Sequence, residues 1–417
     1  MRAICCVHYC ISFIFPIVIG KYHRKTQDPN MTILTKDSDL KTFCQTAATQ
    51  PALYVDTEFM REKTYYAQTC LIQLGLPDGT AVALDMIAAP DLDLSPLTEL
   101  FNAPHILKVL HASRQDLEIF WQLSGKVPAP LFDTQVAAMA VGFAEQVSFD
   151  TLCRHYAKKA PDKSQQFTDW TRRPLTSAQL DYALDDVRLL AVIHRGIMGD
   201  LEEKQRQDWI APDMQELQNP RLYTVTPQDA WQRLKFRDAK PGILAVAQAL
   251  CQWREELARD KNVPRGRILK DEVIQELSLR QPRTAEELAG LRGVPGDVSR
   301  SAHVPLILAA IKRGQACPPD QRPSVAKYDA FPYEKQPTLE MLKLLHKVTA
   351  NRHGIAPRLL ATADELEAIA RVPAALGRMG AGWRYDVLGQ DIEKLLAGKL
   401  ALQLSATGEI VQTDLDA

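Results

Sequence analysis

The feature that most constrains the fold is an alternation of short apolar runs with helix-like stretches over residues 34–200. The run PALYVDTEF (51–59) fits a buried strand, and TCLIQLGL and TAVALDMI flank the hairpin turn signal Pro77-Asp78-Gly79. The segment HILKVLHA (105–112) predicts a further core strand. A hairpin followed by alternating strands and helices predicts an α/β domain with a mixed sheet and flanking helices.

Helical patterns lie between and after these strands. Residues 95–102 and 114–123 predict short helices, and Asp133-Thr134 is expected to cap another that runs through Phe143. A long helix is expected to begin at Thr176-Ser177.

The C-terminal half predicts helices and no convincing strand apart from a possible tail. Thr284-x-x-Glu287 and Thr362-x-x-Glu365 are capping-box signals in two helical regions. Polar, proline-containing stretches separate these regions and are expected to be linkers. The expected division is an α/β domain at 31–210, a linker at 211–239, a small all-α domain at 240–316, a linker at 317–334 and a second all-α domain at 335–417.

The first thirty residues are unlike the rest. The run from Ala3 to Gly20 is mostly apolar and fits a signal peptide or short membrane anchor. However, it contains His8 and three cysteines, and it lacks a small-x-small cleavage site. Met31 opens a plausible start of its own. We therefore expect residues 1–30 to be a non-native extension from a misplaced start codon.

The eight cysteines and the charges set further limits. Beyond residue 10 the cysteines are isolated, which argues against a zinc site or a disulfide scaffold and fits the cytoplasm. Residues 34–200 carry 15 Lys and Arg against 21 Asp and Glu, whereas residues 233–313 carry 16 against 10. This asymmetry fits a metal-binding hydrolase beside a basic module that holds a polyanion, or simply two solvated surfaces of different sign.

Asp56-x-Glu58 ends the first apolar strand. Residues two apart on a strand project to the same face, so the two carboxylates lie together. Like charges at the end of a buried strand are tolerable when a divalent cation lies between them. Alone, the pair is more typical of a strand that has simply ended, with both acids in solvent.

Two further acidic positions join this pair. Asp116 follows the strand at 105–112 in the first turn of a helix, where any acid is favoured by the helix dipole. Tyr182 and Asp186 are four apart on the long helix and share a face, whereas Asp185 points to the surface.

The combined order of VDTEF, LHASRQD and YALDD resembles the three exonuclease motifs of the DEDD superfamily, tyrosine subclass. The segments REKTYYAQTCLIQL (61–74), LFDTQVAA (131–138) and DKSQQFTDWTRRPL (162–175) resemble the ribonuclease D family. The resemblance covers about 34–200 and implies a ribonuclease H-like exonuclease domain.

The resemblance also implies a mechanism. Two Mg²⁺ or Mn²⁺ ions would be held by Asp56, Glu58, Asp116 and Asp186, and Tyr182 would position the attacking water. The expected reaction is 3′→5′ hydrolysis of RNA that releases nucleoside 5′-monophosphates. The resemblance further suggests tRNA precursors as substrates and a monomeric protein.

Residues near the motifs offer cations and aromatic faces for RNA. Arg61, Tyr65 and Tyr66 follow the catalytic strand, although the two tyrosines fit packing under the hairpin equally well. Arg172 and Arg173 stand close in sequence to the last motif. His111 is expected to be a loop residue and not a metal ligand.

The two helical domains resemble HRDC domains, the helical nucleic-acid-binding units of some helicases and of ribonuclease D; residues 240–316 match better than 335–405. Basic residues cluster around one loop of the first domain and form the expected RNA patch, with a solvated loop as the alternative: Arg254, Arg259, Lys261, Arg265, Arg267 and Lys270.

Two other functions remain open from the sequence. One is a DNA-directed exonuclease of the same superfamily, although no polymerase or helicase motif is present. The other is a non-catalytic RNA-binding protein that kept the fold, against which the four intact acids and Tyr182 argue.

Overall fold

A computed structural model of the chain describes residues 32–415, except for 225, 237–238 and 325–330. The expected N-terminal extension, residues 1–30, lies outside the described residues. Within the described part of the chain, no helix is long and apolar enough to cross a membrane.

The N-terminal unit is built on a six-stranded mixed sheet with the order β1-β4-β3-β2-β5-β6. Strands β2, β3 and β4 are antiparallel neighbours, while β1, β5 and β6 pair in parallel with theirs. The mixed sheet and its hairpin are therefore confirmed. The strands are β1 Ile33–Leu34, β2 Ala52–Met60, β3 Gln68–Gly75, β4 Ala81–Asp85, β5 Leu107–Leu110 and β6 Leu131–Asp133.

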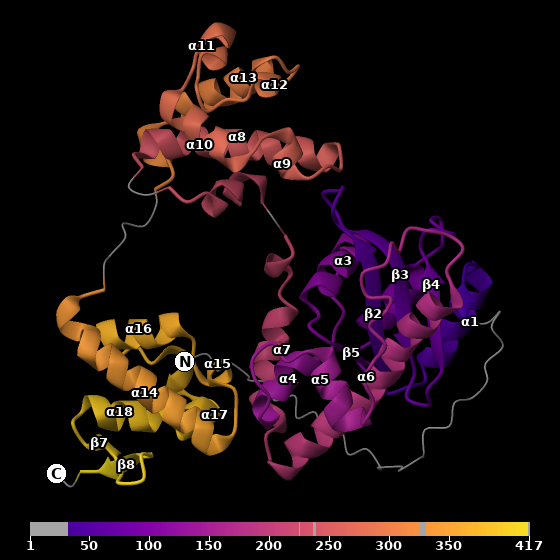
Figure 1. The fold of residues 1–417 in the computed structure, drawn as a ribbon, viewed down its shortest axis with the longest axis vertical. Coiled ribbons are helices and arrows are strands. Elements are labelled where there is room, and N and C mark those ends of the chain that lie inside the picture. The colour runs from indigo at the N-terminus through magenta and orange to yellow at the C-terminus, as the bar shows by residue number, and fades with distance from the viewer. Residues whose placement is uncertain (1–31, 225, 237–238, 325–330, 416–417) are drawn as a thin grey trace, which may run out of the picture.

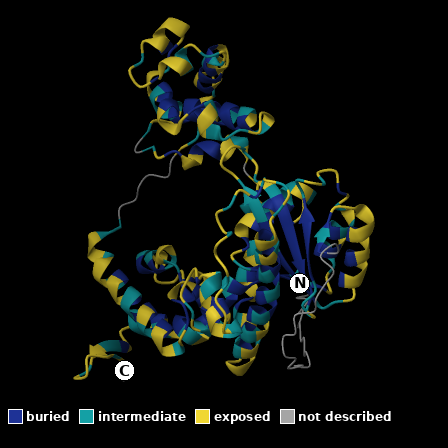
Figure 2. Cartoon of the chain, turned by 45° about the vertical axis from the view of Figure 1, so that its right-hand side comes forward, coloured by how far each residue is buried: buried dark blue, intermediate teal, exposed yellow. Residues whose placement is uncertain are grey.

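Helices cover both faces of this sheet, and the strands between them are buried (Figures 1 and 2). One hydrophobic core joins the sheet to α4 and α6, and a second joins its other face to α1, α2 and α3. The helices of this unit are α1 Asp37–Ala47, α2 Ser95–Asn102, α3 Arg114–Ser124, α4 Thr134–Val141, α5 Phe149–Leu152 and α6 Ser177–Glu203.

Helix α6 lies unusually close to the sheet. Its start is fixed by a capping box in which the side chains of Thr176 and Gln179 each bind the other's backbone nitrogen. Gly75 on β3 permits the close approach, because a Cβ atom there would lie 3.0 Å from the Cβ of Val187. The helix residue just before Val187 is Asp186, so this contact brings a motif acid down onto the sheet.

The C-terminal half forms two further helical cores. The first contains α8 Pro241–Asp260, α9 Arg265–Ile268, α10 Asp271–Arg280, α11 Ala285–Ala289, α12 Gly296–Ser299 and α13 Val304–Gln315. The second contains α14 Gln336–His353, α15 Pro357–Leu360, α16 Ala363–Arg371, α17 Gly382–Arg384 and α18 Gln390–Leu396.

The second of these modules is helical except at the tail, where the sequence left a strand possible. It ends in an antiparallel hairpin of β7 (Leu400–Leu404) and β8 (Ile410–Asp414). Leu400 is buried in the module's core, but most of the hairpin is exposed, which explains the weak apolar pattern of this tail.

The described residues of 211–239, the stretch expected to be a linker, include helical segments. Helix α7 (Ala211–Leu217) buries Met214 against the α/β unit, and Tyr223 is buried in the same unit. Trp231 and Leu234 belong instead to the core of the first helical module. Scattered apolar residues therefore anchor this polar segment at both ends.

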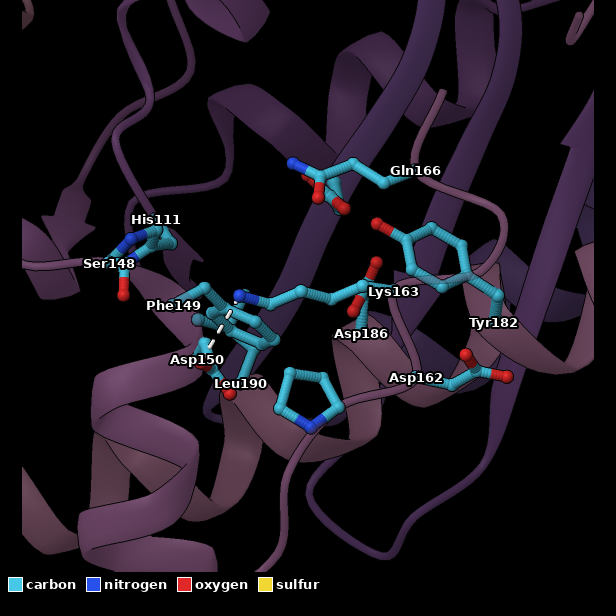
Figure 3. Close-up of a pocket in the computed structure, with 12 residues that line it drawn as sticks. His111, Ser148, Phe149, Asp150, Asp162, Lys163, Gln166, Tyr182, Asp186 and Leu190 are labelled. Carbon is cyan, nitrogen blue, oxygen red and sulfur yellow. Dashed lines mark hydrogen bonds and ion pairs between the residues drawn. The ribbon is translucent and has the colours of Figure 1, made fainter. Parts of the chain in front are cut away.

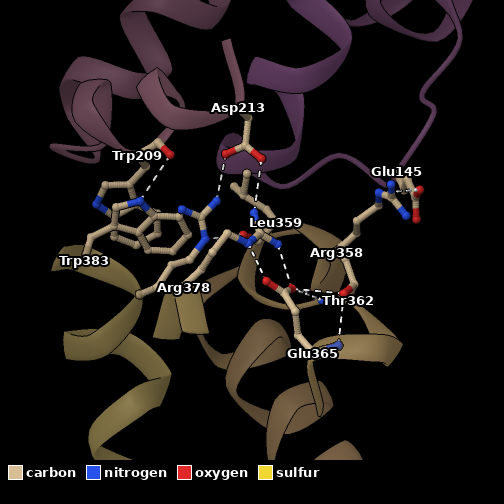
Figure 4. A network of polar contacts seen from close by, with 10 residues as sticks. Glu145, Trp209, Asp213, Arg358, Leu359, Thr362, Glu365, Arg378 and Trp383 are labelled. Atoms are coloured by element: carbon tan, nitrogen blue, oxygen red, sulfur yellow. Dashed lines mark hydrogen bonds and ion pairs between the residues drawn. The ribbon is translucent and has the colours of Figure 1, made fainter. Parts of the chain in front are cut away.

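The second helical module is docked on the α/β unit by aromatic and ionic contacts (Figure 4). The rings of Trp209 and Trp383 stack with centroids 4.2 Å apart, and the Trp383 indole donates to the Trp209 carbonyl. Arg384, which is 4% exposed, donates to Asp213 at 2.7 Å. Because these groups are largely shielded from solvent, they fix the module more firmly than exposed ion pairs would.

Buried His194 on α6 predicts an acid-sensitive fold. Burial lowers the pKa of His194 to about 4, and its Nδ1 shares a hydrogen bond with the Tyr54 hydroxyl. The unfolded chain protonates this histidine near its ordinary pKa, so the folded state loses relative stability as pH falls from about 6.5 to about 4. The loss amounts to about 3 kcal/mol at most. Denaturation of wild type and His194→Phe at several pH values measures it, and equal acid slopes would contradict the prediction.

Candidate active site

Strand β2 carries the first acidic pair at its C-terminal end. Asp56 and Glu58 lie on the sheet face that meets α6, as expected from their alternate spacing. The pairing of β2 with β3 shifts register between Glu58 and Phe59. The unpaired extra residue is Cys70, so the irregularity lies in β3, beside the second carboxylate.

Asp116 reaches the site from the first turn of α3. It is 7% exposed and accepts a hydrogen bond from the Thr57 hydroxyl, which projects from the residue between the two β2 acids. The loop before it is held by Asp133, whose carboxylate accepts from the backbone nitrogens of Ala112 at 3.2 Å and Ser113 at 2.8 Å. Asp133 caps α4, as predicted, and also orders the loop that precedes Asp116.

Helix α6 brings the last two motif residues over the same end of the sheet. Tyr182 and Asp186 face each other one turn apart (Figure 3). Burial raises the pKa of Asp186, and a hydrogen bond from the Tyr182 phenol offsets part of that rise. Asp185 points away, toward Lys159 at 2.9 Å and Arg188 at 3.3 Å. The two neighbouring acids therefore point in different directions, as expected from helical spacing.

These elements bring the motif carboxylates together. One oxygen from each of Asp56, Glu58 and Asp186 lies within 4.8 Å of the others, and no second such group of acids, cysteines or histidines occurs among the described residues. Asp116 stands just outside this triad, but its charge still raises the pKa of Glu58.

The cluster opposes its own ionisation. Burial, followed by the charges of Asp56, Asp186 and Asp116, raises the pKa of Glu58 to about 10. Burial also raises the pKa values of Asp56, Asp116 and Asp186, and the Asp186 charge adds to the effect at Asp56. In the protein alone, burial and mutual repulsion therefore oppose full ionisation of this cluster.

The donor set fits a hard divalent cation. Mg²⁺ and Mn²⁺ prefer carboxylate oxygens, and a bound cation offsets the repulsion that raises these pKa values. Gln73 lies directly opposite Asp56 on β3, is fully buried, and neither polar atom of its amide has a hydrogen-bond partner among the described residues. A buried amide without a partner fits a site that holds a polar ligand in addition to the protein's own groups.

A pocket opens beside the acids, and several of its walls were missed by the sequence reasoning (Figure 3). Lys163 and Gln166 line it from the segment before α6, and Phe149 and Leu190 add apolar walls. The segment 162–175 resembles the ribonuclease D family, but the sequence alone does not indicate which of its side chains face the acids. His111 also lines the pocket and bonds Thr134 at 3.0 Å, as a loop residue and not a member of the carboxylate cluster.

Comparison with known proteins decides the family. Residues 31–202 match the 3′-5′ exonuclease family and residues 243–311 the HRDC domain. The chain is 39% identical to ribonuclease D of Nitrobacter hamburgensis over 384 residues, 92% of this chain and 100% of the relative. It is 42% identical to ribonuclease D of Jannaschia sp. over 91% of this chain and 98% of the relative. The chain belongs to the ribonuclease D family.

A solved structure agrees with this assignment. The crystal structure of Escherichia coli RNase D, described as an exoribonuclease involved in structured RNA processing, superimposes with a TM-score of 0.77 and 29% identity. The match covers 88% of this chain and 98% of that one. Like the ribonuclease D family, the chain is a metal-dependent 3′→5′ exoribonuclease with a mixed-sheet exonuclease domain followed by a helical HRDC domain.

Two of the residues expected to contact RNA bind groups of the protein itself. Arg173 holds Asp85 through two hydrogen bonds of 2.6 Å and donates to the Trp170 carbonyl at 2.8 Å. Arg254 is 2% exposed and donates to the Leu269 carbonyl at 2.8 Å and to Asp271. These internal partners argue against a direct contact of either guanidinium with a phosphate backbone.

Tyr65 and Arg259 form a contact between the exonuclease domain and the first helical module. The Tyr65 hydroxyl donates to the fully buried carboxylate of Glu255, and Arg259 donates to the same hydroxyl at 3.1 Å. Asn262 accepts from the backbone nitrogens of Tyr65 and Tyr66, each at 3.1 Å. These residues link the loop after the catalytic strand to the module, which argues against a direct RNA role for Tyr65.

The other expected RNA contacts lie on the surface. Arg61 is about two-fifths exposed and forms a bidentate pair with Glu118. The side chain of Arg172 is 83% exposed, and Tyr66 lies partly at the surface. The remaining members of the basic loop are wholly or partly exposed: Lys261, Arg265, Arg267 and Lys270.

The interdomain contact predicts that the Tyr65 hydroxyl stabilises this interface more than the Tyr66 hydroxyl does. Tyr65→Phe removes a partner of the buried Glu255 carboxylate, which should lower the free energy of opening of this interface by about 1–3 kcal/mol. Hydrogen exchange of residues 255–262 should therefore be faster in Tyr65→Phe.

Tyr66→Phe is the matched control, because among the described residues the Tyr66 hydroxyl has no such partner. Equal exchange in the two variants would show that the Tyr65 hydroxyl does not hold the module.

Proposed function

We propose that the chain hydrolyses RNA from its 3′ end by a two-metal-ion mechanism, with Asp56, Glu58, Asp116 and Asp186 as ligands of two Mg²⁺ or Mn²⁺ ions. The observation that carries this proposal is the convergence of Asp56, Glu58 and Asp186 within 4.8 Å, with Asp116 adjacent. When bound, such ions supply a water of lowered pKa and positive charge for the leaving 3′ oxygen.

In this proposal the protein's own groups orient the reactants. Burial and the neighbouring Asp186 charge raise the pKa of Tyr182 above its usual range, so its hydroxyl keeps its proton near pH 7. A phenol in that state is a poor base but a good hydrogen-bond donor, and it lies at the pocket wall beside Asp186. Tyr182 would thus orient the attacking water, and the product would be a nucleoside 5′-monophosphate.

We further propose that the natural substrates are tRNA precursors, that the chain acts as a monomer, and that it works in the cytoplasm. The support for an RNA substrate is membership of the ribonuclease D family. A DNA-directed activity has no specific observation in its favour. The proposed domains are 31–210, 240–316 and 335–417. Each helical module has a hydrophobic core of its own, which supports these bounds, although Ala356 and Leu359 of the last module pack in the core of the first domain.

Replacing a proposed ligand tests the mechanism. Asp56→Asn should lower the release of nucleoside monophosphates from an RNA oligonucleotide about 10³-fold or more, because a charge-stabilising carboxylate is lost. Mg²⁺ should raise the melting temperature of the chelator-treated wild type and do so less in the variant. A DNA oligonucleotide of the same sequence shows whether the sugar is discriminated.

Asp185→Asn is the matched control, since its carboxylate faces Lys159 and Arg188 and not the site. It should keep both the activity and the Mg²⁺ response. Retained hydrolysis in Asp56→Asn would remove the proposed mechanism.

The basic loop of the first helical module is a proposed RNA patch. Changing Lys261, Arg265, Arg267 and Lys270 together to Gln should weaken RNA binding and flatten its logarithmic salt dependence by up to about 3, at roughly 0.7 per lost phosphate contact. Fluorescence anisotropy at several salt concentrations measures both quantities.

A control set on the same module keeps the number of lost charges equal. Arg280, Arg283, Arg292 and Arg300 are exposed and lie in or near α10–α12, so their replacement should leave the salt slope unchanged. Equal effects of the two sets would mean that only total charge matters.

A further inference from the structure

Phe167 stands out among the apolar side chains of the molecule. It is 92% exposed, the highest exposure of any large hydrophobic side chain that the structure describes. A phenylalanine is normally buried, since its ring gives up favourable burial when it stays in water. Its neighbour Gln166 lines the catalytic pocket together with Lys163 (Figure 3).

The backbone around Phe167 is held by hydrogen bonds on both sides. Backbone bonds from Gln166 to the Lys163 carbonyl and from Thr168 to the Gln165 carbonyl form successive turns of 3.2 and 3.1 Å. The Thr168 hydroxyl donates to the Gln165 carbonyl and accepts from Gln179 at the start of α6. The exposure of Phe167 is therefore built into an ordered segment.

The two ends of this segment are fixed as well. On one side, Lys163 pairs with Asp150 at 3.1 Å. On the other, Trp170 is 2% exposed and lies in the core, with its ring 6.0 Å from that of Tyr182. Lys163 and Gln166 at the pocket and the exposed ring of Phe167 thus lie in one short segment that is held at both ends.

We propose that Phe167 is a stacking platform for an unpaired base near the 3′ end of the RNA substrate. This inference rests on the proposed function, because it takes the strand to enter the pocket beside Asp56 and Tyr182. An aromatic face held in solvent suits a nucleobase, whose stacking needs no particular sequence. Lys163, with its side chain 57% exposed, adds a positive charge for the backbone next to that base.

The platform specifies the class of substrate. A base can stack on Phe167 only when it is free of its own helix, so a single-stranded 3′ tail is required. A blunt duplex end offers no such base. The preferred substrate is therefore RNA with an unpaired 3′ extension of any sequence.

Binding in a full-length Asp56→Asn background isolates this step from cleavage. Phe167→Ala should weaken the binding of a fluorescent single-stranded oligoadenylate by roughly 5- to 150-fold, the range that corresponds to one stacked base. Phe167→Leu should behave like Phe167→Ala, whereas Phe167→Tyr should bind within about twofold of its parent. The loss should be similar at low and high salt, because stacking is not an electrostatic contact.

Abasic RNAs identify the contact directly. One abasic nucleotide is placed in turn at each of the last four positions, and the parent and Phe167→Ala proteins are compared on each RNA. At one position the two proteins should bind equally, because the base that stacks is missing. Unchanged binding in Phe167→Ala, or the same fold-loss on every abasic RNA, would overturn the proposal.

The outcome is separable from that of the catalytic proposal. If Asp56→Asn still degrades RNA, the two-metal assignment fails whatever Phe167 does. If Asp56→Asn is inactive but binds RNA equally well with and without the Phe167 ring, the stacking platform fails alone.

Discussion

Four carboxylates share one end of the sheet, and burial together with mutual repulsion opposes the ionisation of each. Several features of the fold hold these groups together against that repulsion. Gly75 lets α6 lie close to β3, and strand pairing with β3 holds Asp56 and Glu58 in place. Asp133 and Thr57 fix the loop and the carboxylate of Asp116. A bound divalent cation would offset this repulsion. The exonuclease domain is therefore arranged around a positive charge that its own side chains do not provide.

The parts of the fold that the sequence predicted are those governed by local periodicity. The strand at 51–59, the hairpin around Gly79 and the helix at 95–102 follow from apolar spacing and turn chemistry within a few residues. The same local geometry assigned Asp56 and Glu58 to one face, and separated Asp186 from Asp185. Asp116 was ambiguous by itself, and its place became clear only in combination with the other motif residues.

What the sequence did not predict depends on partners distant in the chain. Arg254 and Arg173 look like free cations until Asp271 and Asp85 are found beside them. Tyr65 meets Glu255 across 190 residues, so no spacing rule relates the two. The sequence gives no reason to single out Phe167, because one apolar residue in a polar loop has no periodic pattern. Solvent exposure, which singles it out, is a property of the folded chain.

Helix α7 bears on where the packing of the exonuclease domain ends. Met214 on one side accepts a hydrogen bond from the backbone nitrogen of Asp133, the residue that orders the loop before Asp116. Asp213 on the other side binds Arg384 of the last module. A fragment cut after α6 would lack Met214, which supports the residue that orders this loop, and Tyr223, which is buried in the core of the same unit. The packing of the exonuclease core therefore continues through Tyr223, well into the stretch that we expected to be a linker.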